Sequence, residues 1–132
     1  MVDLLQIRTF FLVGLGGAMG AMARYGFGSW INRALPMSFP LSTLLINILG
    51  STAMGLFIGM LGRINANWAP DLRLFVAVGV LGGFTTFSAF SLDTIELIER
   101  GEWLSAGLYV LLSVVVCLIG LYLGLLVTRG VA

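Results

Sequence analysis

Residues 79–91 read GVLGGFTTFSAFS and lie inside an uncharged run, 74–92, that is long enough to cross a bilayer. The stretch holds a Gly-Gly pair and a Thr-Thr pair, and both residue types disfavour a continuous helix. A bilayer offers unpaired backbone groups no partner, and each costs several kcal/mol. The stretch therefore predicts a spanning helix that is broken near mid-membrane, where freed amides and carbonyls meet protein, water or an ion.

The composition is that of an integral membrane protein. The chain has 132 residues, of which 59% are hydrophobic and 10% are charged, whereas a soluble domain is about 25% charged. We expect an all-α fold and one domain, 1–132. The net charge of +1 and the absence of Lys argue against a nucleic-acid partner. The N-terminal segment 1–8 does not resemble a cleaved signal peptide, so the first helix is expected to be retained.

Four apolar segments predict four transmembrane helices. They cover about 9–30, 38–62, 74–95 and 104–128, and each approaches the roughly 20 residues that a spanning helix needs. Trp30, Trp68 and Trp103 fall at predicted ends, where aromatic belts lie in membrane proteins.

The arginines leave the orientation open. Four spans place both termini on one side, with Arg8, Arg63, Arg73 and Arg129, and leave Arg33 and Arg100 on the other. This excess is small for a rule that depends on a clear bias. A single orientation and a dual topology, in which copies insert both ways and pair antiparallel, both fit.

Small residues recur at four-residue spacing, a pattern that lets helices approach closely. The sets are Gly16 and Gly20; Ser51, Gly55 and Gly59; Gly120 and Gly124. We expect part of this spacing to serve packing within the subunit. We also expect a homodimer, because four thin helices leave little room to enclose a pathway.

Polar residues inside the spans need a reason, since they usually face a cavity or another helix. Thr43 lies four residues before Asn47, Tyr109 lies four before Ser113, and these spacings share a helix face. For the hydroxyls, bonds between helices or back to the preceding turn explain the pattern as well as a site does. For Asn47, a site and an interhelical bond remain equally open.

The lining that these residues would form suits a small, hard anion. Its side chains donate hydrogen bonds, no carboxylate is expected deep in a span, and Arg24 is the one in-span cation. Phenylalanine rings also carry a positive edge. From the residues alone, apolar packing is the simpler explanation of Phe84, Phe87 and Phe90, and Arg24 also fits a snorkelling anchor.

These residues resemble those of the Fluc (CrcB) family of fluoride ion channels. The resemblance covers almost the whole chain and is carried by Gly16, Gly20 and Arg24, by Asn47, and above all by 82–91, GGFTTFSAFS. It implies an antiparallel, dual-topology homodimer with two pores in a bacterial inner membrane. It further implies a passive channel, not an enzyme, that releases fluoride, excludes chloride and protects against fluoride toxicity.

The resemblance also implies roles for single residues. The fluoride pore would be lined by Phe87, Phe90, Asn47, Thr43, Ser88, Tyr109 and Ser113, with Arg24 near its vestibule. Backbone carbonyls of Gly82 and Thr85 from both subunits would hold one central, structural sodium ion. Two positions depart from the family pattern: Ala89 stands where many members have Thr, and Cys117 where a hydroxyl is frequent.

Two other functions are compatible with four short spans. A small dual-topology, proton-coupled exporter of cationic drugs requires an acidic residue in its first span, and 9–23 contains none. A non-transporting membrane subunit would show no ion flux and would tolerate apolar replacement of its polar residues.

Overall fold

The computed structural model describes residues 3–130 and is helical, with no strand among them. The elements are α1 (Leu4–Ala34), α2 (Leu41–Leu61), α3 (Ala69–Arg73), the π-helical segment η1 (Leu74–Leu81), α4 (Gly82–Phe84), α5 (Phe87–Glu99) and α6 (Trp103–Arg129). The first two and last two residues of the predicted domain, 1–132, lie outside the described part.

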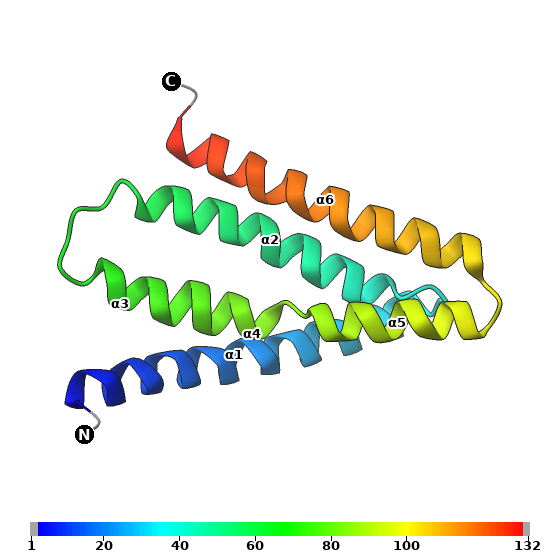
Figure 1. Cartoon of the computed structure of the whole chain (residues 1–132), viewed down its shortest axis with the longest axis horizontal. Coiled ribbons are helices and arrows are strands. Elements are labelled where there is room, and N and C mark those ends of the chain that lie inside the picture. The colour runs from blue at the N-terminus through cyan, green and yellow to red at the C-terminus, as the bar shows by residue number, and fades with distance from the viewer. Residues whose placement is uncertain (1–2, 131–132) are drawn as a thin grey trace.

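Four helical units are long and apolar enough to cross a membrane: α1, α2, α6 and the composite unit Ala69–Glu99. The predicted all-α class with four spans is thereby confirmed. In Figure 1 the four units run side by side along the long axis, and α1 begins at the same end of the molecule at which α6 finishes.

Local sequence sets where these helices start and stop. Asp3 precedes α1, and its side chain accepts a hydrogen bond from the amide of Leu5. Pro36 disfavours helix in the residue before it, and α1 ends at Ala34. Pro40, which lacks an amide hydrogen, directly precedes α2.

Glycines bring the helices together in two pairs, α2 with α6 and α1 with η1. A Cβ on Gly55 would overlap the carbonyl oxygen of Leu121 on α6, and one on Gly20 would overlap that of Val80 on η1. The other spaced glycines, Gly16, Gly59, Gly120 and Gly124, also meet neighbouring helices of the same chain. The prediction that small-residue spacing serves packing within the subunit is confirmed, and the spacing itself is no argument for a dimer.

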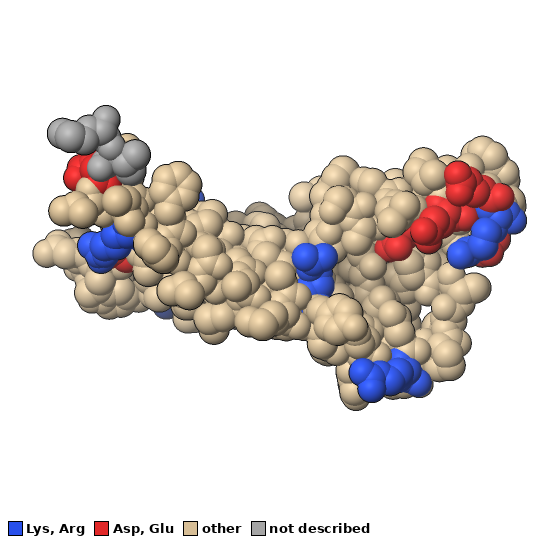
Figure 2. Space-filling model, turned by 90° about the horizontal axis from the view of Figure 1, so that it is seen from below, with Lys and Arg blue, Asp and Glu red and all other residues tan. Residues whose placement is uncertain are grey.

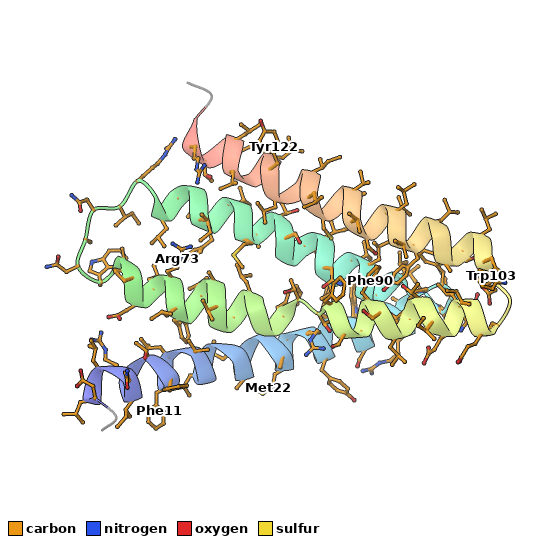
Figure 3. All side chains as sticks on the ribbon, in the orientation of Figure 1. Phe11, Met22, Arg73, Phe90, Trp103 and Tyr122 are labelled. Carbon is orange, nitrogen blue, oxygen red and sulfur yellow. The ribbon has the colours of Figure 1, made fainter. Side chains whose placement is uncertain are left out.

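Many large apolar side chains point outward, as in a protein whose solvent is lipid. Figure 3 shows Phe11 and Tyr122 directed away from the bundle, whereas Phe90 points from α5 toward α2 and α6. The buried cluster consists of Leu44, Leu97, Ala106 and Tyr109. It fastens α5 and α6 to α2 near the α5–α6 turn.

The charges are divided unequally between the two ends. In the described part, one end has four arginines and two aspartates: Asp3, Arg8, Arg63, Asp71, Arg73 and Arg129. The other end has two arginines and four acidic residues: Arg33, Asp93, Glu96, Glu99, Arg100 and Glu102. Figure 2 shows the acidic side chains gathered at that second end. One end of the molecule is therefore net positive and the other end is net negative.

Candidate functional site

The third span contains two residues in extended conformation. α4 ends at Phe84 and α5 begins at Phe87, and between them Thr85 has φ −81° and ψ 157° while Thr86 has φ −152° and ψ 116°. We call Thr85 and Thr86 the interruption. It lies within the Gly- and Thr-rich stretch 79–91. Backbone groups around it need partners other than those of a regular helix.

Asn47 of α2 binds both backbone groups of Thr86. Its Nδ2 donates to the Thr86 carbonyl oxygen at 3.0 Å, and its Oδ1 accepts from the Thr86 amide at 2.8 Å. The amide side chain thus replaces the turn of helix that is missing at this point. Asn47 therefore has a structural role in the interruption.

The two threonine side chains close the helix ends on either side. Thr85 Oγ1 donates to the Leu81 carbonyl at 2.9 Å. Thr86 Oγ1 accepts from the Ala89 amide at 3.1 Å, which caps the first turn of α5. Ser88 Oγ lies 3.2 Å from the same Thr86 oxygen and is exposed.

These bonds deprive two carbonyls of their usual helical partners. In a continuous helix the Thr86 amide would reach the Gly82 carbonyl and the Ala89 amide would reach the Thr85 carbonyl. Here the Thr86 amide is donated to Asn47 and the Ala89 amide to a threonine hydroxyl.

Arg24 lies at the interruption. Its Nε donates to the Gly83 carbonyl oxygen at 3.1 Å, across the contact between α1 and α4. The sequence suggested a place near a vestibule or a snorkelling anchor for Arg24, and the structure adds this bond to a backbone carbonyl within the third span.

A hollow of about 340 Å³ opens beside the interruption, and we call it the first hollow. Its walls come from α2, α5 and α6 together with the interruption itself. It is lined by Asn47, Ser51, Thr85, Thr86, Phe87, Phe90, Ser113, Val114, Cys117 and Leu118. The structure thus brings together Asn47, Phe87, Phe90 and Ser113 from the predicted pore residues.

The phenylalanines of the third span have different surroundings. Phe84 packs on Phe27, with centroids 6.4 Å apart, and it does not line the first hollow. Phe90 lies between Phe87 and Tyr109, at centroid distances of 5.2 and 5.3 Å. Phe87 is 77% exposed in the single subunit. Packing within the subunit therefore explains why a phenylalanine occupies position 84, but it does not explain the exposed phenylalanine at position 87.

Ser113 lines the first hollow and carries a buried polar atom. The residue is only 7% exposed, and its Oγ has no hydrogen-bond partner among the described residues. An unpartnered buried hydroxyl is costly. Because the Oγ atom itself is buried, a small movement of the side chain is needed to bring this hydroxyl to an ion in the hollow.

Asp93 is a functional candidate that the sequence reasoning missed. It lies within α5, which continues to Glu99. Its Oδ2 accepts a hydrogen bond from the hydroxyl of the fully buried Tyr109 at 2.9 Å. The three-residue spacing from Phe90, which places both on one helix face, was the available signal.

A second hollow of about 520 Å³ lies toward the end that carries the acidic residues, and it holds Thr43 and Asp93. Its other walls include the loop between α1 and α2. Of the predicted pore residues, Thr43 thus lines the second hollow, Tyr109 reaches Asp93, and Ser88 lines neither hollow.

Comparison with known proteins gives one consistent result. The family model described as "CrcB-like protein, Camphor Resistance (CrcB)" matches residues 11–125. A protein of Hyphomonas neptunium is 48% identical over 125 residues, covering 95% of this chain and 98% of its own length. Proteins of Rhizobium etli and Roseobacter denitrificans are 45% and 48% identical, covering 92% and 95% of this chain and 97% and 98% of their own. All three are named "Fluoride-specific ion channel FluC".

Proposed function

This chain belongs to the CrcB family, and we propose that it is a passive, fluoride-selective ion channel that lets fluoride leave the cytoplasm. One observation of the structure supports this function above all: Ser113, whose buried hydroxyl has no partner among the described residues, lines a hollow together with Asn47 and phenylalanine rings.

The physical task of such a channel is to replace water around the ion. Fluoride holds its hydration shell tightly, so a pore must supply donors in its place. Ser113 offers a hydroxyl, and ring edges of Phe87 and Phe90 offer positive partial charge. Several moderate sites in succession allow entry without trapping the ion.

Asn47 can contribute to the same lining while it holds the interruption. Its amide nitrogen carries two hydrogens, and one of them is donated to the Thr86 carbonyl. The residue also lines the first hollow. We propose that the second hydrogen is offered to fluoride, so that one side chain both shapes and lines the pore.

We propose an antiparallel, dual-topology homodimer with two pores. The first hollow is open on one side, and the exposed ring of Phe87 stands at its wall. Antiparallel pairing would set the arginine-rich end of one subunit beside the acid-rich end of the other. Two copies of the hollow give two pores. The second subunit would cover the exposed aromatic surface and enclose the path.

The carbonyls of Gly82 and Thr85 suit a structural sodium ion. Both lose their usual helical amide to another acceptor, and a hard cation prefers oxygen ligands of this kind. Broken membrane helices offer freed carbonyls to Na⁺ in the same way. We propose that such an ion, shared by two subunits, offsets the partial negative charge of these carbonyls.

The chain is a multi-pass membrane protein, and we propose the bacterial inner membrane as its location. The comparisons do not support the alternative of a drug exporter, and α1 (Leu4–Ala34) contains no acidic residue. A non-transporting subunit would leave the unpartnered Ser113 hydroxyl without a use.

The test is halide efflux from liposomes that contain the purified protein, followed with a fluoride electrode for fluoride-loaded liposomes and with a chloride electrode for chloride-loaded ones. We expect efflux in fluoride and none when chloride replaces it. Variants Phe87→Ile and Phe90→Ile should reduce the rate, whereas Phe84→Ile, which alters a ring outside the hollow, serves as the matched control. Equal efflux of both halides, or no loss in the first two variants, would contradict the proposal.

A further inference from the structure

A third hollow of about 390 Å³ lies at the arginine-rich end, away from both hollows described above. It is bounded by the end of α2, by α3 and by the end of α6. Ile58, Leu61 and Pro70 give it apolar walls, and Arg73 and Arg129 give it two guanidinium groups. No acidic side chain is among its described lining residues. The hollow therefore joins two positive charges to an apolar surface.

Nothing in α3 itself stabilises the positive charge of Arg73. The residue lies in the first turns of the third span, near the positive end of the helix dipole, where a cation is unfavourable. Figure 3 shows it pointing from α3 toward α2. Asp71, the acidic residue of α3, forms an ion pair with Arg8 of α1 instead. Within residues 3–130 neither ion pair of the structure includes Arg73 or Arg129.

A third arginine adds to the positive charge here. Arg63, in the loop after α2, approaches the end of α6 so closely that a Cβ on Gly130 would lie 3.3 Å from its Nη2. Arg129 stands in the last turn of α6, where the dipole favours a cation. The dipoles at the C-terminal ends of α6 and α2 account for Arg129 and Arg63 and leave the charge of Arg73 in excess.

The position of the hollow matches the depth of lipid headgroups. Trp68 directly precedes α3 and is exposed, and exposed tryptophans mark the membrane–water interface. Basic pockets between transmembrane helices bind anionic headgroups. Arginine pairs with phosphate through two parallel hydrogen bonds.

We propose that this hollow binds an anionic phospholipid. Its headgroup phosphate would lie between Arg73 and Arg129, and an acyl chain would follow the apolar side chains of Ile58 and Leu61. The proposal requires that the chain spans a membrane but does not depend on fluoride conduction. In an antiparallel dimer each membrane face would carry one such site.

The test is native mass spectrometry of the purified full chain with phosphatidylglycerol or phosphatidylcholine added. We expect preferential retention of phosphatidylglycerol. One basic residue near an anionic membrane surface contributes about 1 kcal/mol, so Arg73→Gln or Arg129→Gln should weaken binding about fivefold and the double variant about thirtyfold. Arg73→Lys keeps the charge and should retain most of the phosphatidylglycerol binding. That result would show that the weaker binding of the glutamine variant is not caused by misfolding.

Arg33→Gln is the matched control, because it removes an exposed arginine from the last turn of α1 at the opposite end. Equal retention of the two lipids would overturn the proposal, as would equal effects of Arg33→Gln and Arg73→Gln. Displacement of the lipid by inorganic phosphate alone would overturn it too, since the hollow would then be a site for free anions. Fluoride efflux from the same preparations tests conduction separately.

Discussion

Replacing Asn47 with alanine tests whether this side chain holds the interruption. The change removes the donor at 3.0 Å from the Thr86 carbonyl and the acceptor at 2.8 Å from the Thr86 amide. An unsatisfied, fully buried backbone group costs about 1–3 kcal/mol. Both bonds are only partly buried, so we expect a total loss near the lower end of the roughly 2–6 kcal/mol that two fully buried groups would cost. This is a large share of the 5–15 kcal/mol that typically separates folded from unfolded protein.

Asn47→Asp separates the two bonds. A carboxylate can still accept from the Thr86 amide but can no longer donate to the Thr86 carbonyl. It also places a negative charge in the first hollow. We expect an intermediate loss of stability with a complete loss of fluoride efflux. Acidification, which protonates a carboxyl group, should restore one donor and recover part of the stability.

Thermal unfolding in detergent and electrode-monitored efflux from liposomes measure the two effects. Thr52→Val is the matched control: Thr52 lies on the same helix, and its Oγ1 donates to the Ile48 carbonyl one turn earlier. It should change stability by less than about 1 kcal/mol. A wild-type melting temperature and efflux rate for Asn47→Ala would refute the role of Asn47 as a brace of the backbone.

Three further substitutions separate stability from conduction. Ser113→Ala removes a buried hydroxyl without a partner, so the protein should be as stable as before or up to about 1–3 kcal/mol more stable, while efflux falls; reduced stability would contradict this. Gly20→Ala forces a Cβ against the backbone of η1 and should lower the melting temperature, whereas Gly107→Ala, with open space around it, should not. Arg24→Gln leaves the Gly83 carbonyl without its charged donor and should cost about 1.5–3 kcal/mol in unfolding experiments; an unchanged transition would show that the bond is dispensable.

Local sequence patterns correctly predicted those features that depend on the residues of a single helix. Hydrophobic length gave the four spans, and glycine spacing gave the close contacts within the subunit. The spacing could not reveal that Gly20 meets η1 whereas Gly55 meets α6. A small residue allows another helix to approach closely, but it does not determine which helix that is. The resemblance to a known family supplied residue roles that no single helix discloses.

The hydrogen bonds between distant segments could not be predicted from the sequence, for a different reason. Asn47 and Thr86 are 39 residues apart, and their pairing depends on how α2 lies against the third span. The role of Asp93 was missed because its partner Tyr109 lies on a different helix. Here the hydroxyl of Tyr109, 16 residues later, provides the hydrogen bond that lets the carboxylate sit inside a helix.

The side chains of other helices that bond to the backbone in or beside the interruption come from helices that precede it in the chain, Arg24 from α1 and Asn47 from α2. Chains emerge from the ribosome with the N-terminal part first. Both side chains are therefore already in the bilayer when the third span is inserted. The interruption can form its hydrogen bonds with them without any later segment of the chain. Reversing the order, for example by circular permutation that moves α1 and α2 behind α6, should leave the native contacts possible and yet lower the yield of correctly inserted protein.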